Sequence, residues 1–405
     1  MQRSPRWLLP AIGGLILAVL LCWQLMPKRQ PAEQPEELTV ALYQYVPDQA
    51  RFEKAIQSQW ERSHPEVQLR FVKWDCYLEA PRDDIDVFVF DSVYLGSYIN
   101  AGMLSPIPQD RIADANDILP YALDACTVNE EVYALPEFLC SDILYTRRGD
   151  TELKEVASVA DLYAALGDYS FGKSAEPEGK GLLMDMTSSD EKTLKYLQAH
   201  IDSQGHYEEE FAPPASASHP DEAGKSLLML AKMGAAWQES NPVGADEPYG
   251  QAALFARGVG RAYIGFTESL SNMGDYANEV DLRLFSMATA KNVPVFYADL
   301  AGVNAHVAED KKDFAFDLVN VITGTDVLVA ALASSDSNGV PQYLLVGRKS
   351  VYDQLAAEYP LYATLKQLVE MPDAHVMRVM PDGQAYLKEN GPAIEEHVSA
   401  DLDAA

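Results

Sequence analysis

The segment Ile85–Phe90, which reads IDVFVF, constrains the fold more than any other part of the sequence. It is almost wholly apolar and β-prone, which is typical of a strand that is covered on both faces of a parallel sheet. The surrounding sequence supplies the other elements of such a sheet. Residues 38–45 read as a strand, 48–63 as a helix, 67–74 as a strand and 93–101 as a helix. This order predicts an α/β fold with helices on the faces of an open sheet.

Residues 7–26 form an uncharged apolar run that is long enough to cross a bilayer as a helix. Basic residues precede it, which indicates an export signal or an uncleaved membrane anchor. Lipidation at Cys22 is an alternative, although Leu21 is large for the residue before a lipidated Cys. We expect residues 1–37 to be this signal or anchor plus a polar linker. The folded part, from about Leu38, should then lie outside the cytoplasm and meet a membrane only through the N-terminal segment.

The charge of the chain narrows the choice of partners. There are 31 Lys and Arg against 61 Asp and Glu, which gives a net charge of −30. Nucleic acid is therefore excluded as the main partner, because its phosphates require clustered Lys and Arg. An acidic surface favours cationic ligands. The seven His are scattered, with no HExxH and no CxxC, so we expect no metal and no cofactor.

Polar side chains follow several predicted strands at their carboxyl ends, where α/β sheets bind ligands. Tyr43 and Tyr45 end the first strand, Asp91 follows IDVFVF, and Glu268 follows the strand 261–266. We expect these residues to converge in one cleft. Each has a plainer alternative: Asp91 could simply cap a helix, and Glu268 could be an exposed capping residue.

Cys140 is the candidate nucleophile. The folded part contains only Cys76, Cys126 and Cys140, so at least one thiol is unpaired within the chain, and a Cys76–Cys126 disulfide is left open. A free Cys is most often a buried small hydrophobe. Cys140, however, follows Pro136 in a predicted bend between two strands, near an expected crossing between lobes.

The aromatic and acidic residues at these strand ends suit a flat, cationic heteroaromatic ligand, through stacking and cation–π attraction. Tyr77 and Asp299 belong with this group, since Tyr77 lies near Asp residues and Asp299 follows the apolar strand in VPVFYADL.

Two stretches, VYALPEFLCSDILYTRRGD and ALFARGVGRAYIGFTES, resemble extracytoplasmic solute-binding proteins of the maltose-binding type. A more specific resemblance is to the thiaminase I (thiamine pyridinylase) family, carried by ALYQYVPDQARF, DDIDVFVFDSVYL, the Cys140 segment, GRAYIGFTESLSNMGDYA, VPVFYADLAGVN and PQYLLVGRKSVYDQLAAEYPLY. These segments run in family order across about residues 38–365.

The resemblance implies a two-lobed periplasmic-binding-protein type II fold with the ligand cleft between the lobes. We expect residues 38–146 with about 295–345 in the first lobe, and 147–294 with about 346–405 in the second. It also implies a monomer.

Residue by residue, the resemblance implies that Cys140 is the nucleophile and Glu268 the general base. Asp91 and Asp299 match the acids that contact the aminopyrimidine. The aromatic lining matches Tyr43, Tyr45, Tyr77, Tyr249 and Tyr297. Where the family has a Tyr two residues before the base, this chain has Phe266, which puts fine specificity in question.

Family members displace the thiazolium of thiamine with another nucleophile, such as an aromatic amine or a thiol. For a thiolate to form, the proton of Cys140 has to reach Glu268, although ordinary thiol and carboxyl pKa values differ by about 4 units, or roughly 6 kcal/mol. Either burial raises the pKa of Glu268, which we expect, or the proton is transferred as the sulfur attacks. The alternatives are a non-catalytic receptor for thiamine or a related pyrimidine, which needs neither residue, and a cysteine peptidase, which needs a His partner.

Overall fold

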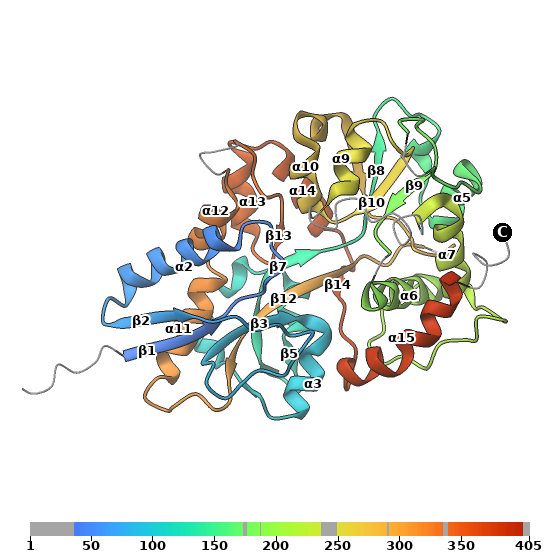
Figure 1. The fold of residues 1–405 in the computed structure, drawn as a ribbon. Coiled ribbons are helices and arrows are strands. Elements are labelled where there is room, and N and C mark those ends of the chain that lie inside the picture. Colours follow the sequence, from blue (N-terminus) through green and yellow to red (C-terminus); the bar gives the residue numbers. More distant parts are fainter. Residues whose placement is uncertain are drawn as a thin grey trace, which may run out of the picture.

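The computed structural model describes residues 36–172, 176–186, 188–235, 249–289, 291–334 and 339–399. The predicted signal or anchor over residues 7–26 lies outside the described residues, as does most of the linker that follows it. Two mixed sheets organise the described part of the chain, the larger at lower left and the smaller at upper right in Figure 1.

The larger sheet contains the segment IDVFVF. Its strands are β1 (Glu36–Ala41), β2 (Val67–Phe71), β3 (Val87–Asp91), β4 (Leu104–Ser105), β7 (Ala134–Cys140), β12 (Val295–Asn304), β13 (Leu345–Val346) and β14 (His375–Val376). The strand order is β13-β7-β12-β3-β1-β2, and β4 and β14 also pair with β12. All five residues of β3 are buried, as its apolar sequence predicts. β3 runs parallel to β1 and antiparallel to β12, so the sheet is mixed.

The smaller sheet has the order β11-β8-β10-β9. Its strands are β8 (Ile143–Arg147), β9 (Leu182–Met184), β10 (Ala262–Gly265) and β11 (Val280–Arg283), and a separate hairpin pairs β5 (Thr127–Val128) with β6 (Glu131–Val132). The chain crosses directly between the two sheets at two places, from β7 to β8 and from β11 to β12.

Helices surround both sheets. They are α2 (Gln49–Ser63), α3 (Leu95–Asn100), α4 (Pro120–Ala125), α5 (Val159–Leu166), α6 (Ser189–Gln204), α7 (Glu222–Leu230), α9 (Gly250–Ala256), α10 (Leu270–Met273), α11 (Lys312–Ile322), α12 (Thr325–Leu332), α13 (Lys349–Ala356), α14 (Leu361–Val369) and α15 (Gly383–Ser399). As predicted, α2 begins after Asp48, whose side chain accepts a hydrogen bond from the Arg51 N–H, and it buries Phe52, Ile56 and Trp60. In the described part of the chain, no single helix is long and apolar enough to cross a membrane, and α11 with α12 meets that test only as a pair bent by 45°.

The expected division of the chain between lobes stays a prediction, and the strand pairing bears on it at two places. β8 of the smaller sheet begins at Ile143, ahead of the expected boundary at 146. β14 pairs with β12 in the larger sheet, although we expected residues after 346 in the second lobe, whereas α15 packs against α6 and α7.

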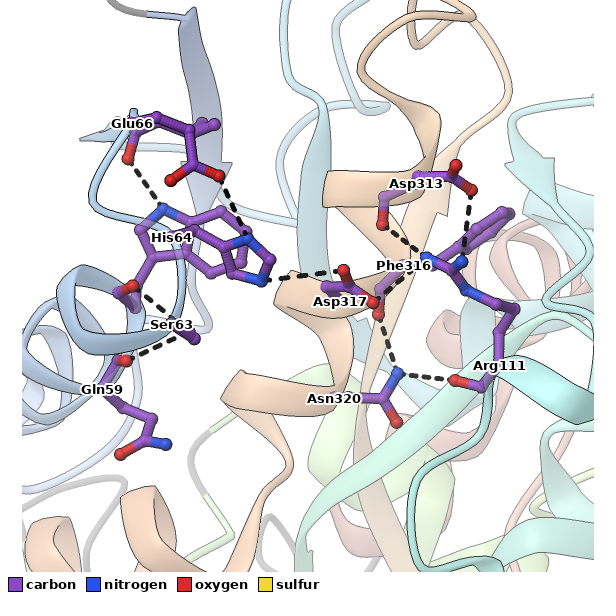
Figure 2. Close-up of polar contacts among 11 residues, drawn as sticks. Gln59, Ser63, His64, Glu66, Arg111, Asp313, Phe316, Asp317 and Asn320 are labelled. Atoms are coloured by element: carbon purple, nitrogen blue, oxygen red, sulfur yellow. Dashed lines mark hydrogen bonds and ion pairs between the residues drawn. The ribbon is translucent and has the colours of Figure 1, made fainter.

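A polar network fastens the outer helices of the larger sheet to each other (Figure 2). His64, which ends α2, stacks on Trp60 and lies 3.6 Å from a carboxylate oxygen of Asp317 on α11. Asn320, one turn further along α11, donates to the carbonyls of Arg111 and Phe316 and accepts from the N–H of Ala113 at 2.8 Å. These bonds fix the loop before α4 against α11.

Candidate active site

A cavity of about 810 Å³ lies between the two sheets. The larger sheet contributes the ends of β3 and β7 and the N-terminal half of β12, and the other wall consists of β10, α6 and the start of α9. All nine predicted site residues line it: Tyr43, Tyr45, Tyr77, Asp91, Cys140, Tyr249, Glu268, Tyr297 and Asp299. The expected convergence of strand ends in one cleft is thus confirmed.

The pairing of β12 with its neighbours places four of these residues opposite one another in two pairs. β12 lies between β3 and β7 and runs antiparallel to both, so that Asp299 faces Asp91 and Tyr297 faces Cys140. The register shifts between Ala298 and Leu300, which leaves one residue of β12 opposite two of β7. A bulge of this kind redirects side chains and is common beside active sites.

Cys140 stands at the very end of β7, and the bend follows it rather than preceding it. We expected the bend at Pro136, but Pro136 lies inside β7, and the chain turns at Ser141 and Asp142. The hydroxyl of Ser141 donates to the carbonyl of Val295 at 2.8 Å, which anchors this turn to β12. Cys76, Cys126 and Cys140 are all free thiols, and the first two are buried.

Aromatic rings and a buried acid form the end of the cavity beside β3. The hydroxyl of Tyr77 donates to Asp91 at 2.7 Å and lies 2.8 Å from the hydroxyl of Tyr43. Tyr45 donates to Asp75 at 2.6 Å, and the rings of Tyr43, Tyr45 and Tyr77 meet edge to face with centroids 5.4 to 6.2 Å apart. These contacts hold the three rings against one another at this end of the cavity.

Two carboxyl groups at this end resist ionisation. Burial raises the pKa of Asp91 above its ordinary value, against hydrogen bonds that lower it. Burial also raises the pKa of Asp299 well above its ordinary value, and the nearby charges of Asp91 and Glu268 add to the effect. A carboxyl group that holds a proton both donates and accepts hydrogen bonds, as an aminopyrimidine requires, and raised pKa values favour that form.

Glu268 enters the cavity from the short turn after β10, where it is 4% exposed. The hydroxyl of Tyr249 donates to its Oε1 at 2.9 Å, and its Oε2 has no hydrogen-bond partner among the described residues. Burial raises the pKa of Glu268 to about 7, as predicted. Tyr249 holds this contact from a left-handed conformation with φ of 62°, which costs a bulky residue roughly 1–2 kcal/mol.

The thiol of Cys140 is also hard to ionise. It keeps some exposure, yet the surrounding protein desolvates it and raises its pKa well above the ordinary value, and the charge of Glu268 adds to this. No hydrogen bond joins the thiol to the carboxyl of Glu268 in the described residues. The higher pKa of Glu268 therefore does not close the gap between the two groups, since the pKa of the thiol rises as well.

No feature of the sequence indicated the charged wall opposite β3. It contains Asp142, Asp185, Ser188, Asp190, Glu191 and Lys195. Lys195 is almost fully buried, with its Nζ 5.9 Å from the ring centroid of Phe266. The charged sequence at the start of α6 is typical of a solvated helix face, so no pattern separates Lys195 from its neighbours. Asp142 could have been suspected, because it follows Cys140 by two residues.

The comparisons with known proteins agree with this geometry. A model of the Thiaminase-1 domain matches residues 141–288. Thiaminase-1 of Paenibacillus thiaminolyticus is 39% identical over 354 residues, which cover 87% of this chain and 86% of the relative. The chain belongs to the thiaminase I family.

Solved structures of thiaminase I extend the likeness to three dimensions. Thiaminase I of Clostridium botulinum in complex with thiamin has a TM-score of 0.85 at 38% identity, and the match covers 89% of this chain and 100% of that one. Maltose-bound MalE3 of T. maritima, at 14% identity and a TM-score of 0.60 over 91% of this chain and 100% of that one, shares the fold alone. The predicted family and the two-lobed type II binding-protein fold are both confirmed.

Proposed function

We propose that this member of the thiaminase I family is a thiamine pyridinylase, which transfers the pyrimidinylmethyl group of thiamine from thiazole to another nucleophile. The observation that carries the proposal is the meeting of Cys140 and Glu268 in one cavity, from opposite sheets, beside two buried acids with raised pKa values and a set of tyrosines. A receptor that only binds its ligand requires neither the thiol nor the base.

In the bound state, Tyr43, Tyr45 and Tyr77 enclose the flat pyrimidine, and Asp91 and Asp299 hydrogen-bond its amino group and ring nitrogen. The edge-to-face packing of the three rings leaves them little freedom. Little entropy is then lost when the pyrimidine binds between them.

The first half of the reaction begins when the sulfur of Cys140 forms a bond to an electron-poor carbon of the pyrimidine. Its proton passes to Glu268, and the free Oε2 is the acceptor. Because both pKa values are raised, the proton moves as the carbon–sulfur bond forms, rather than in advance. The bond from the methylene carbon to thiazole then breaks, and thiazole leaves as a neutral molecule with the bonding electrons.

In the second half, an amine or thiol forms a bond to the methylene carbon and loses its surplus proton to solvent. The carbon–sulfur bond to Cys140 breaks, and the departing thiolate takes back the proton held by Glu268. Forming and then breaking the sulfur bond divides one difficult displacement into easier steps. The acidic surface and the cationic substrate have complementary charges.

The test is an incubation of the purified protein with thiamine and aniline, with the products followed by mass spectrometry. We expect free thiazole and the anilinomethyl pyrimidine from the wild type, and a loss of at least about a thousandfold in Cys140→Ser and Glu268→Gln. Tight retention of intact thiamine without product would instead indicate a receptor.

The location, the oligomeric state and the partners of the protein are inferred from the same fold and family. The fold and the family support an extracellular protein, and an N-terminal signal or anchor would place it there. We propose that the protein acts as a monomer with an amine or thiol co-substrate, without a metal or cofactor and without a nucleic-acid partner.

A further inference from the structure

The wall of the cavity formed by α6 and the turn after β7 carries charges that the proposed chemistry leaves unused. Lys195 lies with its Nζ 3.6 Å from Oδ1 of Asp142 and 3.4 Å from Oε2 of Glu191. Burial alone would lower the pKa of Lys195, but the two carboxylates raise it. The ammonium group of Lys195 therefore stays charged at neutral pH, beside a carboxyl oxygen of Asp142.

Asp142 has a partner on only one of its two oxygens. The residue is 3% exposed, and its Oδ2 has no hydrogen-bond partner among the residues that the structure describes. A second buried side chain of this cavity, Gln251 at the start of α9, leaves its Oε1 without a partner as well. Both atoms accept hydrogen bonds and cannot donate them. Buried polar groups are rarely left unpaired, so the wall is built for a ligand that donates.

Asp142 is also close to the reacting atoms. It follows Cys140 by two residues, and its charge is one of those that raise the pKa of the Cys140 thiol and of the Tyr297 hydroxyl. Met184, Leu194, Ile264 and Phe266 give the same cavity an apolar lining. The combination of one anionic acceptor with an apolar surface suits a primary or secondary amine that has an aromatic or aliphatic body.

Given the proposed function, on which this inference rests, we propose that Asp142 is the binding group for the N–H of the incoming amine. Glu191 and Lys195 position the side chain of Asp142. Its Oδ2 accepts a hydrogen bond from the amine and turns the nitrogen lone pair toward the methylene carbon. The Phe266 ring, which replaces the tyrosine of the family, adds apolar surface where the body of the amine lies.

Asp142 then accepts the surplus proton of the second half-reaction. The nitrogen lone pair forms a bond to the methylene carbon, the bond between carbon and the Cys140 sulfur breaks, and the thiolate recovers its proton from Glu268. The new carbon–nitrogen bond leaves a positive charge and a surplus proton on nitrogen. That proton passes to the Asp142 carboxylate and from there to water, so one proton is released in each turnover.

The test compares Asp142→Asn with the wild type, using aniline, which carries N–H, and pyridine, which has a lone pair and no N–H. In a double-displacement reaction, kcat/KM for thiamine reports the first half and kcat/KM for the nucleophile reports the second. We expect kcat/KM for aniline to fall about tenfold to a hundredfold, because a hydrogen bond to a charged group is lost. The values for pyridine and thiamine should change less than about threefold.

Two further variants distinguish a specific effect of Asp142 from a general loss of charge and from a failure to fold. Asp190→Asn removes a negative charge from the same wall and should leave the aniline-to-pyridine ratio of kcat/KM unchanged. Asp142→Glu keeps the charge beside Lys195 but displaces it, and should also lower that ratio, which serves the test should Asp142→Asn not fold.

Equal losses for aniline and pyridine would overturn the inference, and so would a loss confined to thiamine, which would place the thiazolium or its hydroxyl at Asp142. These results differ from a failure of the proposed function. In that case the wild type would form no product with either nucleophile.

Discussion

Replacing Glu268 by Gln should stabilise the folded protein at alkaline pH while it removes the proposed base. Burial raises the pKa of Glu268 from its ordinary 4.5 to about 7. The folded state therefore disfavours the ionised carboxylate, by about 3 kcal/mol at 1.36 kcal/mol for each pH unit of difference. Glutamine has nearly the same shape, carries no charge and still accepts the hydrogen bond from Tyr249.

The sign of this pH dependence follows from the direction in which folding changes the pKa of Glu268. A carboxyl group whose folded pKa exceeds its unfolded pKa contributes stability that is fully present below about 4.5 and is lost as the pH rises through about 7. Glu268→Gln removes this dependence. The difference in unfolding free energy between variant and wild type should thus rise from near zero at pH 4 to as much as about 3 kcal/mol in favour of the variant at pH 8.

Urea unfolding of both proteins, followed by tyrosine and tryptophan fluorescence at several pH values, measures this difference. Subtracting the two curves at each pH removes the contributions of the titrating groups whose pKa values do not depend on the charge of Glu268. A variant that is less stable than the wild type at pH 8, or a difference that does not change with pH, would refute the reasoning and would mean that Glu268 is not desolvated.

Three other results follow from the same contacts. The wild-type kcat/KM for thiamine should rise with pH and level off above about 7, because only the ionised Glu268 accepts the thiol proton, and a flat profile from pH 5 to 9 would oppose this. Tyr249→Phe removes a hydrogen bond that lowers the pKa of Glu268, so the midpoint of that profile should move about one pH unit higher, which the same assay measures. Asn320→Ala removes two hydrogen bonds between α11 and the loop before α4 and one within α11, and should cost about 1–3 kcal/mol in urea unfolding without changing kcat, because the site is elsewhere.

Strand-end residues were predictable from the sequence because of a general property of sheets. Strands that run the same way end at the same edge, so Tyr43 and Asp91, at the ends of the parallel β1 and β3, had to lie close together. The burial of IDVFVF followed from its composition in the same way. These inferences need only local sequence and a rule about sheets.

Other features depend on strand order and register, which local sequence does not contain. Tyr297 faces Cys140 because β12 is inserted antiparallel between β3 and β7, and only the resemblance to a family indicated that they share a site. We expected the turn at Pro136, because a proline normally interrupts a strand. In the structure Pro136 lies within β7, and the turn follows Cys140. Lys195 was missed because a lysine on a charged helix is usually solvated, and its burial arises from the packing of α6 against the cavity.

The central claim, that Cys140 attacks the pyrimidine and Glu268 takes its proton, is tested most directly by trapping the covalent intermediate. The protein is mixed with thiamine in the absence of amine or thiol, quenched with acid within milliseconds to seconds, digested and mapped by mass spectrometry. We predict that the pyrimidinylmethyl group is attached to the peptide containing Cys140, that it disappears when aniline is added before the quench, and that it forms far more slowly in Glu268→Gln. An adduct on another residue, or undiminished turnover in Cys140→Ser, would contradict the account.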